Sequence, residues 1–135
     1  MTEKLKTKEL LADLYEAYLK VTWWFFAFPS REMSLNDLRQ VLKISKTTAH
    51  RVVEELVKDG FLKKEELGRT WRISCNKEHI YNHSRKIANN LAIIHESNII
   101  EKIYELVKNP RVIILFGSYR WGEDTEKSDI DIAVE

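Results

Sequence analysis

The sequence has few of the features that mark secreted or membrane proteins. It contains one cysteine, Cys75, so no internal disulfide can form. The N-terminus lacks the order of charged, apolar and small residues that makes a signal peptide. The most apolar run, Val21–Phe28, is far too short to cross a bilayer. We therefore expect a cytoplasmic protein that has no membrane partner.

Other absences narrow the functional class. No Ser-His-Asp or Cys-His arrangement is visible, and there is no internal repeat or low-complexity tract. Hydrophobic residues make up 44% and charged residues 32% of the chain, which is ordinary for a globular protein. The 135 residues suit one domain or two small ones.

The charge is balanced overall, at +1, but it is unevenly placed. Arg39–Arg72 holds nine Lys or Arg against five Asp or Glu, and Gly117–Glu135 holds two against six. A basic middle and an acidic end favour a nucleic-acid contact followed by a cation site. Two ordinary solvated surfaces are the open alternative.

The C-terminal stretch carries the most specific pattern. Five apolar residues, Val112–Phe116, predict a short strand buried on both faces, and Gly117-Ser118 predicts a strand-to-helix turn. Farther on, side-chain alternation along a strand predicts that Asp129 and Asp131 share one face. The residues that alternate with them, Ile130, Ile132 and Val134, would enter the core. Paired carboxylates on a rigid strand suit Mg²⁺, which completes its shell with phosphate and water oxygens.

This stretch resembles the nucleotidyltransferase superfamily that includes DNA polymerase beta, especially its minimal nucleotidyltransferase branch. The matching positions are Gly117, Ser118, Gly122, Ser128, Asp129 and Asp131. The resemblance implies that Gly117 and Ser118 hold the phosphates of a nucleoside triphosphate. It also implies that Asp129 and Asp131 are catalytic and bind Mg²⁺. Glycine and a helix N-terminus suit such phosphate contacts. A coincidental hairpin is the alternative.

The resemblance also implies parts that the sequence does not show. The family uses a third carboxylate on a later strand, which helps to hold the metal and to activate the attacking hydroxyl. The sequence stops at Glu135, so we expect a truncated catalytic unit that is inactive as an isolated chain.

The N-terminal half predicts a long helix from Thr7 to Phe28, ended by Pro29. Its apolar face is formed by Leu10, Leu14, Ala17, Val21, Trp24 and Phe28. The aromatic cluster Trp23–Phe26 is broader than one face requires. It fits either a thick core helix or a contact in a homodimer.

Two shorter helices and a hairpin follow. Ser34 and Ser45 are predicted N-caps of helices over residues 35–42 and 46–59, and Gly60 suits a helix C-terminus. Strands are predicted at residues 61–65 and 70–74, with a turn between them, and Cys75 is predicted to be a core thiol.

This order of elements, from Thr7 to Cys75, resembles a winged helix-turn-helix domain. The resemblance implies binding of double-stranded DNA, with the third helix in the major groove and the hairpin wing against phosphates. The implied contacts are Lys46, Thr47, Thr48, His50 and Arg51 on the helix, and Lys63, Lys64, Arg69 and Arg72 on the wing. A protein-docking module is the open alternative.

Between the two halves, residues 76–108 predict two helices with a break near Ser97. An apolar stripe on the first is formed by Ile80, Ile87, Leu91 and Ile94. The first helix would link the domains, and the second would pack under the strand Val112–Phe116.

Together these patterns predict an α+β protein. Residues 1–76 form a winged helix-turn-helix of three helices plus a β-hairpin wing, residues 77–97 a linker helix, and residues 98–135 the start of a nucleotidyltransferase α/β fold (strand, Gly-Ser, helix, strand).

The corresponding function is Mg²⁺-dependent transfer of a nucleotide from a nucleoside triphosphate to an acceptor hydroxyl by a DNA-binding protein. The alternative is a DNA-binding regulator whose nucleotidyltransferase segment is vestigial or completed by a partner. A homodimer through the aromatic first helix or the open sheet edge stays possible.

Overall fold

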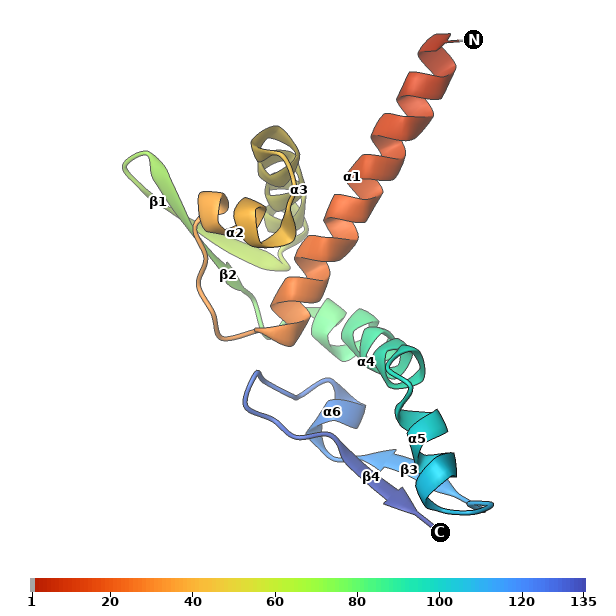
Figure 1. The fold of residues 1–135 in the computed structure, drawn as a ribbon. Helices are drawn as coiled ribbons and strands as arrows, with labels where there is room; N and C mark the ends of the chain where they lie inside the picture. The colour runs from red at the N-terminus through yellow and green to blue at the C-terminus, as the bar shows by residue number, and fades with distance from the viewer. Residues whose placement is uncertain (1) are drawn as a thin grey trace. The chain divides into compact units, whose positions relative to one another are not determined.

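The computed structural model describes the backbone of residues 2–135 and the side chains of residues 12–135. The chain divides into two compact units, Met1–Lys77 and Glu78–Glu135 (Figure 1). Helices are combined with small antiparallel sheets in the described chain, so the predicted α+β class is confirmed. No helix in this described part combines the length and the apolar character that a membrane crossing needs.

The first unit contains three helices followed by a hairpin. The elements are α1 (Thr2–Ala27), α2 (Leu35–Leu42), α3 (Lys46–Asp59), β1 (Leu62–Leu67) and β2 (Thr70–Cys75). Serine side chains cap α2 and α3, because Ser34 Oγ accepts from the Asp37 N–H and Ser45 Oγ from the Thr48 N–H, both at 3.1 Å. Gly60, at φ 87°, ends α3 in the left-handed conformation. The predicted bounds of α2 and α3 are confirmed.

The hairpin is longer than predicted. Its strands pair antiparallel from Leu62 opposite Cys75 to Leu67 opposite Thr70, so β1 continues past the expected end at residue 65. Met33, which precedes α2, exchanges two backbone hydrogen bonds with Ile73, at 2.9 and 2.7 Å. This bridge ties the α1–α2 connection to the hairpin and fixes β2 against the helices.

Aromatic side chains from α1 fill the core of the first unit. Trp24, Phe25 and Phe26 are buried, whereas Trp23 is 40% exposed. The Phe26 and Phe61 rings meet edge to face with centroids 5.3 Å apart. The predicted core includes Leu10, whose side chain lies outside the described residues. Three of the four clustered aromatics thus belong to the core, and Cys75 is buried as predicted.

The second unit places two helices before a β–α–β segment. Its elements are η1 (Ile80–His83), α4 (Arg85–Glu96), α5 (Ile99–Leu106), β3 (Ile113–Phe116), α6 (Ser118–Trp121) and β4 (Asp131–Val134). Strands β3 and β4 pair antiparallel, from Ile113 opposite Val134 to Phe116 opposite Asp131. The predicted order of strand, Gly-Ser, short helix and strand is therefore present.

The apolar stripe predicted on residues 80–94 is only partly correct, since Ile94 is buried and Ile87 half-buried but the other two members are not. Ile80 is 63% and Leu91 49% exposed, and the side chains that α4 buries are those of Lys86, Asn90 and Ile94. This face is buried because its polar groups find partners in the second unit, to which α4 belongs. Residues 77–97, predicted as a linker, thus contribute a packed helix to that unit.

The burial predicted for the C-terminal strands is also wrong. Ile114 and Phe116 are 51% and 48% exposed, so β3 is not covered on both faces. Ile130 is 40% exposed and Val134 39%, while Ile132 is half-buried, so these residues do not form a core stripe. Helix α5 buries none of its residues and does not serve as the packing layer expected under β3. A two-stranded sheet has too little surface to bury its own side chains.

We expect Phe61→Ala to cost about 3–5 kcal/mol of unfolding free energy, because it removes a fully buried ring from the core of the first unit. Leu67→Ala, at a position 43% exposed at the end of β1, is the control and should change stability by less than about 0.5 kcal/mol. Urea unfolding followed by tryptophan fluorescence measures both values. Equal losses in the two variants would contradict the described core.

Candidate functional site

The candidate site begins where β3 turns into α6. Gly117 caps α6 with φ 78° and ψ −165°, a conformation open essentially to glycine alone. A Cβ at this position would overlap the carboxylate oxygen Oδ2 of Asp131 and lie 3.2 Å from its Cγ. The backbone of Gly117 is therefore in direct contact with the Asp131 side chain. Strand pairing explains this contact, because Asp131 lies opposite Phe116 in the β3–β4 ladder.

Asp129 does not lie on the strand that carries Asp131. Strand β4 begins at Asp131, so the expected alternation from Asp129 onward does not apply. Asp129 instead follows a tight turn in which the Thr125 N–H donates to Ser128 Oγ at 2.9 Å and the Ser128 N–H donates to the Thr125 carbonyl at 3.0 Å. Ser128, a position of the resemblance, thus closes the turn that leads into the two carboxylates. Asp129 is exposed and Asp131 half-buried.

Asp129 and Asp131 supply some of the oxygen ligands that a hard divalent cation needs. Two carboxylates match the one or two that Mg²⁺ takes from a protein when phosphates and water complete its octahedron. In the described part of the chain no group of three or more His, Cys, Asp or Glu side chains is placed to hold a metal. Asp129 and Asp131 are therefore a two-carboxylate set.

A buried polar cluster that sequence reasoning missed lies behind this turn. Lys86 Nζ donates to the Asp124 carbonyl at 2.6 Å and lies 3.6 Å from Asp124 Oδ1. Asn90 Nδ2 donates to Asp124 Oδ1 at 2.8 Å and to the Tyr119 carbonyl at 3.0 Å. Burial, followed by the charge of Asp124, raises the pKa of the Tyr119 hydroxyl. The sequence does carry a signal for this cluster, because Lys86 and Asn90 lie four residues apart on a predicted helix. A search for apolar periodicity does not detect such a polar pair.

Two exposed residues of α6 were also missed. Trp121 is 59% exposed, and the Arg120 guanidinium lies 4.8 Å from the centre of its ring. Gly122 follows at φ 74°, and a Cβ there would lie 2.5 Å from the Asn82 carbonyl oxygen. Close packing against η1 therefore requires glycine at this motif position.

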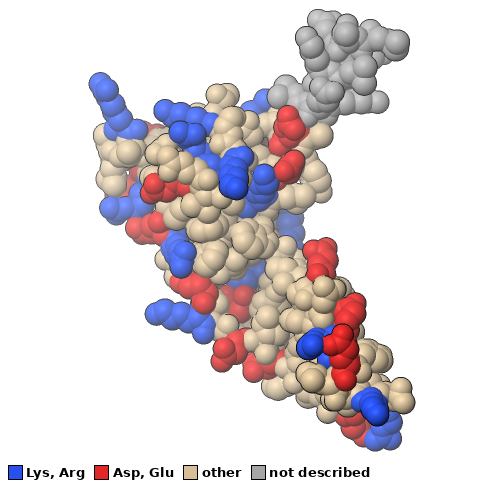
Figure 2. Space-filling view, in the orientation of Figure 1, with Lys and Arg blue, Asp and Glu red and all other residues tan. Residues whose placement is uncertain are grey.

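In the first unit, positive side chains gather around the hairpin tip and the neighbouring helices, with acidic ones among them (Figure 2). Lys46, Arg51, Lys63 and Arg69 are exposed and have no ion pair with any described residue, and Thr47 is exposed as well. These four exposed cations can meet an anion.

The other predicted wing cations are already paired. Lys64 Nζ lies 2.6 Å from Glu54 Oε1, 3.4 Å from Glu66 Oε1 and 4.1 Å from the centre of the Trp71 ring. The hydrogen bond with Glu54 raises the pKa of Lys64 and lowers that of Glu54. Arg72 lies 3.4 Å from Glu32 and 3.6 Å from Glu65. Both contacts reduce the charge offered to a partner.

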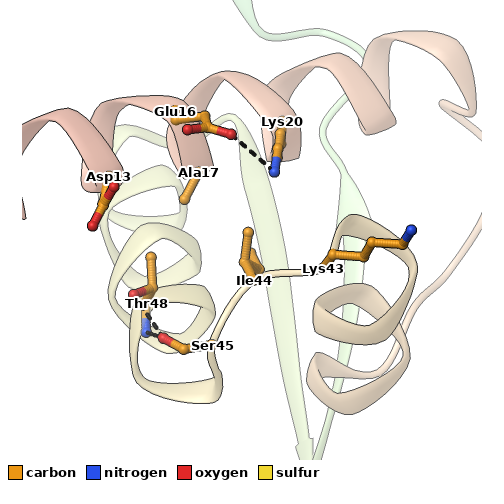
Figure 3. A pocket seen from close by; sticks show the side chains of 8 residues that line it. All are labelled: Asp13, Glu16, Ala17, Lys20, Lys43, Ile44, Ser45 and Thr48. Atoms are coloured by element: carbon orange, nitrogen blue, oxygen red, sulfur yellow. Dashed lines mark hydrogen bonds and ion pairs between the residues drawn. The ribbon is translucent and has the colours of Figure 1, made fainter.

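Two predicted contacts of α3 are engaged within the unit. The His50 ring stacks on Trp71 with centroids 4.6 Å apart. Thr48 Oγ1 accepts a hydrogen bond from Ser45 Oγ at 2.8 Å and lines a cavity of about 230 Å³ beside α1 (Figure 3). Acidic and basic side chains share this cavity wall, and Glu16 and Lys20 pair there at 3.1 Å.

The comparisons with known proteins agree with the C-terminal geometry. Residues 98–135 match the family model described as polymerase beta, nucleotidyltransferase. The match covers less than half of the chain and includes β3, α6, β4 and both carboxylates. Neither the search of curated proteins nor the search of solved structures gave a match. The second unit therefore contains a nucleotidyltransferase-like segment.

We expect Gly117→Ala to displace Asp131, because the added Cβ would overlap its carboxylate oxygen. The backbone conformation adds a strain of about 1–3 kcal/mol. Chemical denaturation should show that loss, and backbone NMR shifts should change at Asp131. Gly68→Ala is the control, since its φ is also positive, at 63°, but nothing lies within 4 Å of the added atom. Shifts at Asp131 that stay unchanged in Gly117→Ala would contradict the contact.

Proposed function

We propose that the second unit belongs to a Mg²⁺-dependent nucleotidyltransferase, which transfers a nucleotide from a nucleoside triphosphate to an acceptor hydroxyl. The observation that carries the proposal is the contact between Gly117 and the Asp131 carboxylate, within the segment that matches the nucleotidyltransferase model. This contact puts the turn suited to phosphate beside a carboxylate suited to the cation that phosphate requires.

Each residue has a separate task in this proposal. Asp129 and Asp131 would hold Mg²⁺, which when bound neutralises charge on the triphosphate. Gly117 lets the chain approach a phosphate closely, because it carries no Cβ. Ser118, the first residue of α6, offers a hydroxyl and a backbone N–H that has no acceptor within so short a helix. The β3–β4 pairing holds Asp131 beside the Gly117 turn before the substrate arrives.

We expect Asp129→Asn and Asp131→Asn each to weaken Mn²⁺ binding at least tenfold, because each removes a charged oxygen ligand. Mn²⁺ replaces Mg²⁺ as a paramagnetic probe, and electron paramagnetic resonance measures the free ion. Mg²⁺-dependent transfer from a radiolabelled nucleoside triphosphate, wherever wild type shows it, should be lost in both variants. The control is Glu101→Gln on the exposed face of α5. Wild-type affinity in both Asp variants would refute the site.

For the first unit we propose double-stranded DNA as the partner. In support, α3 is a capped helix whose N-terminal half exposes Lys46 and Arg51, and the hairpin beside it exposes Lys63 and Arg69. Such cations neutralise phosphates and release counterions. The three helices and the hairpin fixed by the Met33–Ile73 bridge are consistent with a winged helix, which presents its third helix to the major groove.

A second candidate function is a DNA-binding regulator that does not catalyse transfer. The observation that favours it is the pair Asp129 and Asp131, which suffices to hold Mg²⁺ with a bound nucleotide. In this case Asp129 and Asp131 would bind a nucleotide without turnover, or a partner would complete the site. Nucleotide binding with no transfer, together with intact DNA binding, distinguishes this candidate from the enzyme.

We expect the double variant Lys46→Ala, Arg51→Ala to flatten the dependence of DNA affinity on salt by about two units of slope, because each lost phosphate contact removes about 0.9. Fluorescence anisotropy with a labelled duplex at several salt concentrations measures this slope. Lys58→Ala, in the last turn of the same helix, is the control and should leave it unchanged. Lys64→Ala should have a smaller effect than Arg51→Ala, since two glutamates already pair with Lys64. An unchanged slope in the double variant would count against a DNA contact through α3.

A further inference from the structure

The buried cluster of α4 connects, contact by contact, to the two carboxylates. Lys86 and Asn90 are 2% and 3% exposed, and both bind Asp124, which is 7% exposed. Asp124 comes directly before the turn that Thr125 and Ser128 close. This turn leads to Asp129 and Asp131. Helix α4 therefore holds Asp124 at the start of the segment that carries the carboxylates.

The same cluster holds the other side of the candidate site. Asn90 Nδ2 also donates to the Tyr119 carbonyl, at 3.0 Å, so one side chain binds both α6 and the α6–β4 connection. Tyr119 directly follows Ser118. Near the end of α6, the Glu123 N–H donates to the Ser118 carbonyl at 3.0 Å. Asn90 is thus placed to set the spacing between the Gly117-Ser118 turn and the Asp129–Asp131 segment.

The choice of residue types supports a positioning role. A buried lysine and aspartate contribute little net stability, because the cost of removing both charges from water offsets their attraction. Ile or Leu at positions 86 and 90 would bury apolar surface without that cost. They would leave the Asp124 and Tyr119 carbonyls without these donors. The polar residues therefore fix the path of the backbone, which apolar side chains cannot do.

We propose that Lys86 and Asn90 are positioning residues of the nucleotide- and metal-binding site, and that the functional unit includes α4, which lies outside the matched residues 98–135. The part of this inference that is tested by Mn²⁺ binding rests on the proposed function. Its structural part, the hold of α4 on residues 119–128, is measured without metal. Failure of one proposal is therefore distinguishable from failure of the other.

The first test compares Asn90→Ala with Asn89→Ala in the full chain. Asn89 is the neighbouring asparagine on α4, and it has no side-chain hydrogen bond with any described residue. In the metal-free protein, hydrogen exchange of the Glu123, Thr125 and Ser128 amides should be about tenfold faster in Asn90→Ala, because buried hydrogen bonds are lost. Protection of α3 in the first unit should not change. Equal exchange at these amides in the two variants would overturn the proposal.

The second measurement is the Mn²⁺ affinity, determined by electron paramagnetic resonance. Asn90→Ala should bind Mn²⁺ about 10–100-fold more weakly than wild type, the usual effect of removing a group that orients metal ligands. Asn89→Ala should bind like wild type. Loss of Mn²⁺ binding in Asp129→Asn and Asp131→Asn, with wild-type affinity in Asn90→Ala, would overturn the positioning role alone. If the Asp variants do not alter Mn²⁺ binding, the proposed metal site fails, and the exchange result alone decides whether α4 holds this segment.

A third variant tests the role of Lys86 and keeps the proposal testable if Asn90→Ala does not fold. The double variant Lys86→Met, Asp124→Asn removes both buried charges together and keeps side chains of similar size, so no unpaired charge is left inside. It also keeps an oxygen at position 124 for Asn90. It should stay folded by circular dichroism, lose the Lys86 tether to the Asp124 carbonyl, and bind Mn²⁺ more weakly. Wild-type exchange at Thr125 and Ser128 together with wild-type Mn²⁺ affinity would overturn the role of Lys86.

Discussion

The candidate site in the second unit is built around one close approach, that of the Gly117 backbone to the Asp131 carboxylate. The antiparallel pairing of β3 with β4 brings the end of one strand beside the start of the other, and Phe116 lies opposite Asp131. The turn after Phe116 then has no room for a side chain. Glycine is required here by contact as well as by its backbone conformation. Strand pairing thus brings the Gly117-Ser118 turn and the Asp131 carboxylate together.

The sequence predicted the elements of the fold well where the signals are local. Ser34, Ser45 and Gly60 sit at helix ends with the capping geometry that their side chains favour, and the bounds of α2 and α3 follow from them. The Gly-Ser turn and the β3–β4 order were found because their residues are close in sequence. Asp129 was misplaced, because alternation holds only within a strand, and the Ser128 hydrogen bond to Thr125 keeps the chain in a turn up to that point.

Sequence failed where pairing between distant groups decides the outcome. Sequence reasoning gave all nine predicted DNA contacts equal weight. In the structure, Lys64 and Arg72 each meet two carboxylates, and His50 stacks on Trp71. The surface that stays positive is therefore smaller than composition suggests. Likewise, apolar periodicity pointed to Ile80 and Leu91, which are exposed. It missed Lys86 and Asn90, because the groups that bind these two side chains lie about 30 residues or more away along the chain.

Polar side chains thus make up much of what the second unit buries. Charged and amide side chains lie inside, against Asp124, while Ile114 and Phe116 are half-exposed on the same sheet face as Asp131. A unit with so little apolar burial cannot rely on its core to hold a loop within the tolerance that metal binding needs. Directional bonds can do so, because each fixes a distance and an angle where apolar contact fixes neither. The order of the candidate site therefore depends more on the polar contacts of α4 than on the hydrophobic content of its own strands.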